Sequence, residues 1–241
     1  MSADQRAAED VQTTRQRPPR RSLSALTVLG LVLLLAGLSA VGYMAYQYFG
    51  TNVVSQKSFS SEKNNLRKLW QQDQHKPGPG KPVADADQVS RAIPGTAVAL
   101  LRVPSWGADF EVPILKGISQ DTLAKGVGIY GSSVPPGQVG NFAIAGHRIT
   151  HGQPFSRLLD LKKGEQIVVE TRTAIFTYVL DNAPSDLTVK DDAGWVLDPV
   201  PGHPGLKPTK ALITLTTCQD LFHSPDRSVG FGHLESTVHK K

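Results

Sequence analysis

The sequence predicts an all-β domain, a barrel or a sandwich, preceded by one membrane-spanning helix. Two observations lead to this prediction. Short runs rich in β-branched and aromatic residues follow one another from about Ala92 to the C-terminus, and turn-forming stretches rich in Pro and Gly separate them. Near the N-terminus, residues 22–56 contain no charged side chain at all, which is typical of a segment that lies in lipid.

The apolar segment Leu23–Ala45 is long enough to cross a bilayer, which takes roughly 20 helical residues. Just before it lie Arg15, Arg17, Arg20 and Arg21, and the next positive residue after it is Lys57. The N-terminus is therefore expected in the cytoplasm and the rest outside the cell. A cleaved signal peptide is the alternative, but its apolar core is shorter and "LSA" at 38–40 is a poor cleavage site. We therefore expect an uncleaved, single-pass anchor in the cell membrane.

Composition divides the chain into four parts. Residues 1–21 are expected to form a cytoplasmic tail, and residues 22–49 the transmembrane anchor. Residues 50–92 are polar, then rich in Pro, Gly and Lys, and are expected to be a linker with a short helix in "SSEKNNLRKLWQQ". The globular domain then occupies residues 93–241.

Eight β-rich runs make up that domain. They are "TAVALLRVP", "ADFEVPIL", "GNFAIAG", "EQIVVET", "AIFTYVL", "SDLTVK", "ALITLTTC" and "SVGFGHL". Helical pattern is scarce: "SQDTLAKG", with Ser119 or Asp121 as its cap, and "PFSRLLDL" each allow a turn or two.

The composition excludes several classes of function. The formal charge of +5 comes without a dense basic tract, so no nucleic-acid binding is expected. A single cysteine, Cys218, excludes an internal disulfide and a zinc site built on cysteines. No tight acidic run accompanies the motifs described below, so neither a calcium site nor any other cofactor is expected.

Cys218 stands at the end of "ALITLTTC", where a strand delivers a side chain to a cleft. A thiol attacks only as the thiolate, which needs a base or a positive group nearby. Taken alone, a cysteine on a strand is more often buried and inert. Its placement on an exported domain, where idle thiols are less common, favours a chemical role.

Two further residues supply what the thiol lacks. His147 follows the apolar strand "NFAIAG" and is well placed to face a groove as a base. Arg227 follows Cys218 across a loop, and if the flanking segments pair as a hairpin its guanidinium reaches the same cleft. Taken singly, each also fits an ordinary surface residue. The other histidines of this region, His151, His223 and His233, are expected to matter much less.

In this combination the chain resembles the sortase family of cysteine transpeptidases. The resemblance rests on "AGHR" at 145–148, "TLTTC" at 214–218 and "DRSVGFGHL" at 226–234, and it covers about residues 93–236. It implies an eight-stranded β-barrel and an enzyme that cleaves a C-terminal LPxTG-type sorting motif between Thr and Gly.

The resemblance also implies the roles of single residues. Cys218 would form a thioacyl enzyme, and His147 would protonate the leaving amine and deprotonate the incoming one. Arg227 would hold the substrate carbonyl or the oxyanion, and Thr217 would help to hold the substrate. The partners would be exported proteins with a sorting signal and an amine of peptidoglycan or lipid II.

The stretch "GIYGSSVPPGQVGNFA" followed by "GHRITHGQPF" is most similar to the class E sortases of high-GC Gram-positive bacteria. In that class a tyrosine ahead of the histidine strand is linked to preference for LAxTG over LPxTG, and Tyr130 is the matching residue. Pilin-polymerising sortases often carry a lid with a DP-aromatic motif, which is absent from residues 50–95.

Three alternatives stay open on the sequence alone. One is an extracytoplasmic cysteine peptidase that only hydrolyses its substrate, and another is a pilin-polymerising sortase. The third is a β-barrel binding module with a chance cysteine, for which replacing Cys218 would have no effect on the proteins displayed at the cell surface.

Overall fold

A computed structural model of the chain describes residues 24–74, 85–218 and 225–240. Helix α1 (Ala25–Ala45), the short π-helix η1 (Tyr46–Gly50), helix α2 (Thr51–Gln74) and helix α3 (Asp85–Arg91) come first in the chain. The chain divides into two compact units, one up to Tyr43 and the other from Met44 onward. The expected cytoplasmic tail and most of the Pro/Gly-rich stretch lie outside the described residues.

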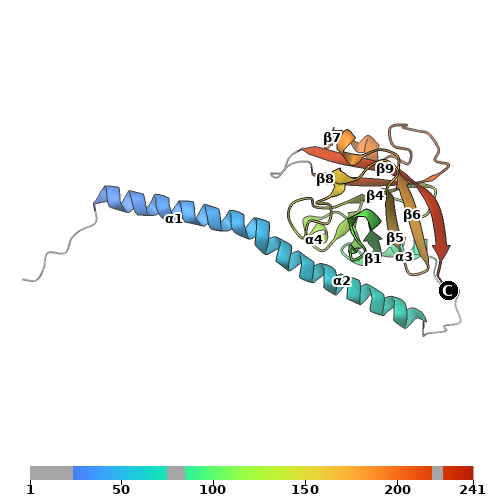
Figure 1. Ribbon diagram of the computed structural model, residues 1–241, viewed down its shortest axis with the longest axis horizontal. Helices are drawn as coiled ribbons and strands as arrows, with labels where there is room; N and C mark the ends of the chain where they lie inside the picture. Colours follow the sequence, from blue (N-terminus) through green and yellow to red (C-terminus); the bar gives the residue numbers. More distant parts are fainter. Residues whose placement is uncertain (1–23, 75–84, 219–224, 241) are drawn as a thin grey trace, which may run out of the picture. The chain divides into compact units, whose positions relative to one another are not determined.

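The second unit is built on one sheet of nine strands (Figure 1). The strands are β1 (Ala97–Arg102), β2 (Val112–Lys116), β3 (Val127–Ile129), β4 (Gly140–Ala145), β5 (Gln166–Glu170), β6 (Ala174–Leu180), β7 (Thr188–Lys190), β8 (Ala211–Cys218) and β9 (Asp226–His239).

The sheet closes into a barrel because β9 pairs with both β8 and β6. The order around the ring is β6-β5-β1-β2-β3-β4-β8-β9, and β7 is added outside it on β9. The predicted closed barrel of eight strands is therefore confirmed. Closure removes the unpaired edges that an open sheet of this size would leave.

Two pairs in the ring are parallel, β2 with β3 and β4 with β8, and the others are antiparallel. The chain leaves β4, builds β5, β6 and β7, and returns as β8 beside β4. The register of this pair runs from Gly140 opposite Ala211 to Ala145 opposite Thr216. Both strands therefore end at the same rim of the barrel.

All eight predicted β-rich runs contain a strand, and one short strand was missed. β3 holds Gly128 at its centre, and glycine is a poor predictor of a strand. Packing explains the residue: a Cβ on Gly128 would lie 2.3 Å from the carbonyl oxygen of Gly117. β9 also continues to His239, beyond the predicted "SVGFGHL".

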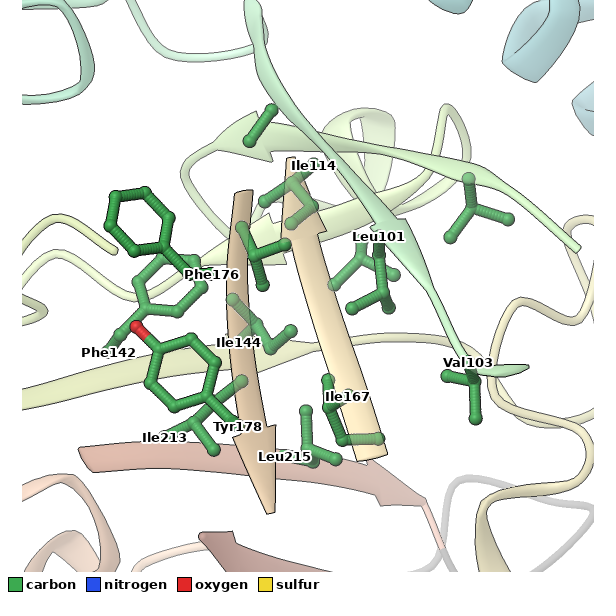
Figure 2. Packing of buried hydrophobic residues seen from close by; sticks show 14 of the residues in the cluster. Leu101, Val103, Ile114, Phe142, Ile144, Ile167, Phe176, Tyr178, Ile213 and Leu215 are labelled. Atoms are coloured by element: carbon green, nitrogen blue, oxygen red, sulfur yellow. The ribbon is translucent and has the colours of Figure 1, made fainter. Parts of the chain in front are cut away.

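The interior of the barrel is filled by aliphatic and aromatic side chains from most of the strands (Figure 2). The buried set includes Leu101, Ile114, Ile144, Ile167, Tyr178, Ile213 and Leu215, each at most 1% exposed. Because Ile213 and Leu215 alternate with residues that point the other way, β8 presents a second, outer face.

The two helical turns that the sequence predicted in the domain lie near their expected places, and three others were not predicted. Ser119 caps α4 (Gln120–Leu123), and its hydroxyl accepts a hydrogen bond from the Thr122 amide at 3.2 Å. The stretch "PFSRLLDL" contains the 3-10 turn η3 (Leu158–Asp160). Three more such turns are η2 (Pro104–Trp106), η4 (Pro184–Asp186) and η5 (Gly194–Leu197).

α2 occupies the first part of the segment expected to be a linker with one short helix. It has 24 residues, and it packs against the barrel through Phe59 and Leu66, which are 2% and 5% exposed. Arg67 adds an ion pair of 2.6 Å with Glu111. This stretch of chain is thus an integral layer of the second unit.

Within the described residues, one helix, Ala25–Gln72, is long and apolar enough to cross a membrane, as judged by length and composition. Its apolar part is α1, none of whose residues is buried against protein. This agrees with the predicted anchor segment.

Tyr178 provides a test of the core. Its ring is fully buried, its hydroxyl accepts a hydrogen bond of 2.7 Å from the Gly137 amide, and burial raises its pKa. Tyr178→Phe leaves that amide without its acceptor, which is expected to lower the free energy of unfolding by about 1–3 kcal/mol. Urea denaturation of the full chain in detergent measures this loss. Unchanged stability would show that the bond contributes nothing.

Candidate active site

The parallel strands β4 and β8 place their C-terminal ends side by side. Beyond the last paired residues, the Gly146 amide donates to the Thr216 carbonyl at 3.2 Å, and the Thr217 hydroxyl donates to the Gly146 carbonyl at 2.7 Å. The ladder therefore persists past the end of β4. Two further steps of the register from Ala145–Thr216 bring His147 level with Cys218.

β9 completes the arrangement from the other side of β8. The last antiparallel pair of that ladder is Cys218 with Arg227, as the predicted hairpin required. Residues directly opposite one another in neighbouring strands project from the same face of a sheet and lie about 5 Å apart. The structure thus brings the backbones of His147, Cys218 and Arg227 to adjacent positions on one rim of the barrel.

Arg227 lies between acidic neighbours. Its Nη2 is 3.7 Å from Asp191 Oδ2, and its Nη1 donates to the Asp226 carbonyl at 3.1 Å. The Asp191 carboxylate is about half exposed, so this pair is loosely held and screened by water.

Gly146 is required by close packing just before His147. A Cβ on Gly146 would lie 2.8 Å from Cδ2 of Phe155, whose ring is fully buried. The Phe155 amide in turn donates to the His147 carbonyl at 3.0 Å. His147 is therefore fixed by its backbone on both sides.

The imidazole of His147 stacks on that of His151. Their ring centroids are 4.7 Å apart, and the planes are inclined by 26°. Sequence reasoning missed this contact, because it treated His151 as a residue of little importance. The spacing in "GHRITHG" was the available signal, although a loop of unknown shape gave no reason to bring the two rings together.

Thr217 lies on the inner side of this arrangement. It is 2% exposed, and its hydroxyl is committed to the Gly146 carbonyl. In this geometry the hydroxyl joins the end of β8 to the residue before His147, and the predicted role of Thr217 in holding the substrate stays a prediction.

Tyr130 follows β3 and reaches the outer face of β8. Its hydroxyl lies 3.0 Å from Thr216 Oγ1, and Thr216 is two residues before Cys218. The tyrosine singled out in the sequence is therefore near the same rim as the other candidates. The pairing of Tyr130 with Thr216 could not be read from residues so far apart in sequence.

Of the remaining histidines of interest, His233 lies away from this rim, opposite Leu212 at the other end of β8. His233 is on β9, and its Nδ1 is 2.8 Å from Asp181 Oδ1. His223 lies outside the described residues. Across the part of the chain that the structure describes, no group of three or more His, Cys, Asp or Glu residues could hold a metal ion.

A family model for the sortase domain matches residues 101–235, more than half of the chain. The chain belongs to the sortase family of cysteine transpeptidases. The sequence-based resemblance to this family is thereby confirmed.

Individual sortases agree with the class E assignment. The chain is 33% identical to sortase SrtE1 of Streptomyces coelicolor, over 91% of its own length and 60% of that protein. It is 30% identical to SrtE2 of the same organism, over 92% of its length and 87% of that protein. The chain thus spans less than two thirds of SrtE1 but most of SrtE2.

Solved structures show the same likeness. Sortase E of Streptomyces avermitilis matches with a TM-score of 0.55 and 35% identity, covering 61% of this chain and 93% of that one. Sortase E1 of Streptomyces coelicolor, solved with a tripeptide in its active site, matches with a TM-score of 0.52 and 36% identity, covering 60% and 91%.

Gly146→Ala tests whether close packing of the backbone before His147 determines the catalytic rate of this sortase. The new methyl group meets the immobile Phe155 ring, so the loop must shift, and displacements near 1 Å cost up to about 100-fold in rate. We expect kcat/KM on a sorting-signal peptide to fall about 10- to 100-fold.

Gly194→Ala is the matched control, because a Cβ there has no neighbour within 4 Å. It should retain normal activity. If Gly146→Ala were equally active, close packing at Gly146 would not determine the position of His147.

Proposed function

We propose that this sortase cleaves an LAxTG- or LPxTG-type sorting motif between Thr and Gly and joins the exported protein to a peptidoglycan amine. The observation that supports this most is the strand register, which sets His147, two residues past the end of β4, level with Cys218 on β8 and Arg227 on β9. A nucleophile, a proton carrier and a fixed positive charge at one rim are the groups that acyl transfer requires.

The reaction begins with the Cys218 thiolate attacking the Thr carbonyl. Negative charge develops on the carbonyl oxygen, where the Arg227 guanidinium stabilises it. When the C–N bond breaks, protonated His147 gives its proton to the departing glycine amine, and a thioester to Cys218 remains.

The second half runs in reverse with a new amine. Neutral His147 accepts a proton as the amine attacks the thioester, the C–S bond breaks, and Cys218 leaves as thiolate. The product is an amide between the threonine and the acceptor, and the imidazolium–thiolate pair is restored. No group beyond these side chains is required.

In this scheme Thr217 helps to position His147. Its buried hydroxyl holds the Gly146 carbonyl and so keeps the residue before His147 against the end of β8. In this proposal Tyr130 and Thr216 contact the substrate residues before the scissile bond, and the pairing of their hydroxyls on the outer face supports this role.

We also propose that α1 anchors the enzyme as a single-pass membrane protein, with its N-terminus in the cytoplasm. The arginines before the apolar segment and the absence of charge up to Lys57 support this orientation. The barrel then works outside the cell, where its substrates arrive.

The full chain in detergent, given an LAxTG peptide and an amine acceptor such as triglycine or diaminopimelate, is expected to yield the amide-linked product. Cys218→Ala and His147→Ala should abolish this transfer, and Arg227→Ala should lower it about 100- to 1,000-fold, as loss of an oxyanion partner does. Mass spectrometry distinguishes the amide from the free acid.

His233→Ala is the histidine control, because it removes a half-exposed surface imidazole, and it should transfer normally. Exclusive formation of the free acid would identify a hydrolytic peptidase instead. Normal turnover by the Cys218→Ala variant would contradict the enzyme assignment to this site.

Tyr130→Phe tests the source of motif preference. The change keeps the ring but removes the hydroxyl that pairs with Thr216. If that hydroxyl favours alanine in LAxTG, losing one neutral hydrogen bond of about 1 kcal/mol lowers the LAxTG-to-LPxTG ratio of kcat/KM about fivefold. An unchanged ratio, measured by competition between the two peptides, would exclude the hydroxyl as a determinant.

A further inference from the structure

The first two turns of α2 bind the loop that follows His147. The Gly152 amide donates to Asn52 Oδ1 at 2.8 Å, and the Gly152 carbonyl accepts from Gln56 Nε2 at 2.9 Å. Asn52 and Gln56 are four residues apart and therefore lie on the same face of the helix. Together their side chains bind both the backbone amide and the backbone carbonyl of Gly152.

Apolar packing reinforces these bonds. A Cβ on Gly152 would lie 2.6 Å from the Phe59 ring and 3.1 Å from Ser55 Cβ, so α2 and this loop are in direct contact. Phe59 and Ser55 are each 2% exposed. Only glycine permits such an approach at this position.

The loop needs external support because its backbone is unusual. His151, Gly152 and Gln153 have φ angles of 53°, 80° and 52°, three successive residues in the left-handed region. This conformation is unfavourable for His and Gln, and such residues persist where the surroundings impose them. The His151 amide also donates to Thr51 Oγ1 at 3.4 Å, a third contact with α2.

The supported loop acts on His147 through the ring of His151. That ring stacks on His147 at 4.7 Å, and its Nδ1 lies 2.9 Å from the Thr150 hydroxyl, which sets its orientation. Burial lowers the pKa of His151, which favours the neutral form of the ring. A neutral partner can lie against His147 in either protonation state without repelling it.

We propose that α2 is a positioning element for the proposed acid–base residue, and that Asn52, Gln56 and His151 are its positioning residues. α2 holds Gly152, the left-handed turn presents the His151 ring, and that ring fixes the plane of His147. This inference rests on the proposed role of His147. It departs from the sequence-based expectation that His151 matters little.

The test uses the full chain in detergent with an LAxTG peptide and triglycine. The double variant Asn52→Ala/Gln56→Ala removes both bonds to Gly152 and is expected to lower kcat about 10- to 100-fold. KM for the peptide should stay within about twofold, because α2 does not form the face that we assign to substrate. His151→Ala should lower kcat similarly, whereas His151→Phe, which keeps a stacked ring, should recover most of it.

Asn64→Ala/Asn65→Ala is the matched control, since it removes two exposed amides from the same helix. It should be as active as the parent protein. Thermal unfolding of every variant shows whether the domain is intact, and if the Asn52/Gln56 variant does not fold, the comparison of His151→Ala with His151→Phe decides.

Two results would overturn the inference: parent-like kcat in both the Asn52/Gln56 and His151→Ala variants, or equal losses in His151→Ala and His151→Phe. Failure of the proposed function would give a different result. If the His147→Ala variant were active, His147 would not be the acid–base residue at all. Inactive His147→Ala together with fully active Asn52/Gln56 and His151 variants refutes the positioning role alone.

Discussion

The parallel pairing of β4 with β8 is the constraint on which the site depends. The two strands are separated by three intervening strands in the chain, yet their register sets His147 against the end of β8. A slip of one residue would exchange the inner and outer faces of β8, moving Ile213 and Leu215 out of the core. Burial of apolar side chains in the barrel therefore also determines which residues meet at its rim.

Closure of the barrel extends this constraint to Arg227. β9 is held by β8 on one side and by β6 and β7 on the other, so its register cannot move independently. A buried polar network lies on the outer face nearby: the Thr214 hydroxyl donates to Asn141 Oδ1 at 2.8 Å, and Asn141 Nδ2 donates to the carbonyls of Val196 and Asp198 at 3.2 and 3.0 Å. Because both ends of the Asn141 amide are bonded, the network favours a single arrangement of β4, β8 and η5.

The strand pairing of the barrel alone does not fix the loop between β4 and η3. This loop carries His147 but runs through a left-handed turn that its own sequence does not favour. Contacts with α2 provide the additional support, since Asn52 and Gln56 bind the amide and the carbonyl of Gly152. The helix that follows the apolar segment is thus in direct contact with the loop that carries the proposed acid–base residue.

The sequence by itself determined the apolar N-terminal helix and the strand-rich domain, and it singled out the three candidate residues, because these depend on local composition, alternation and motif. It also indicated the hairpin that pairs Cys218 with Arg227, since one short loop joins the two strands. It missed β3, where glycine hides a strand, and expected only a short helix where α2 forms. The tertiary structure alone decided that Thr217 faces inward, that Tyr130 meets Thr216, and that His151 stacks on His147 under α2. These contacts join residues far apart in the chain or held in an unfavoured turn, and only packing of the whole domain brings them together.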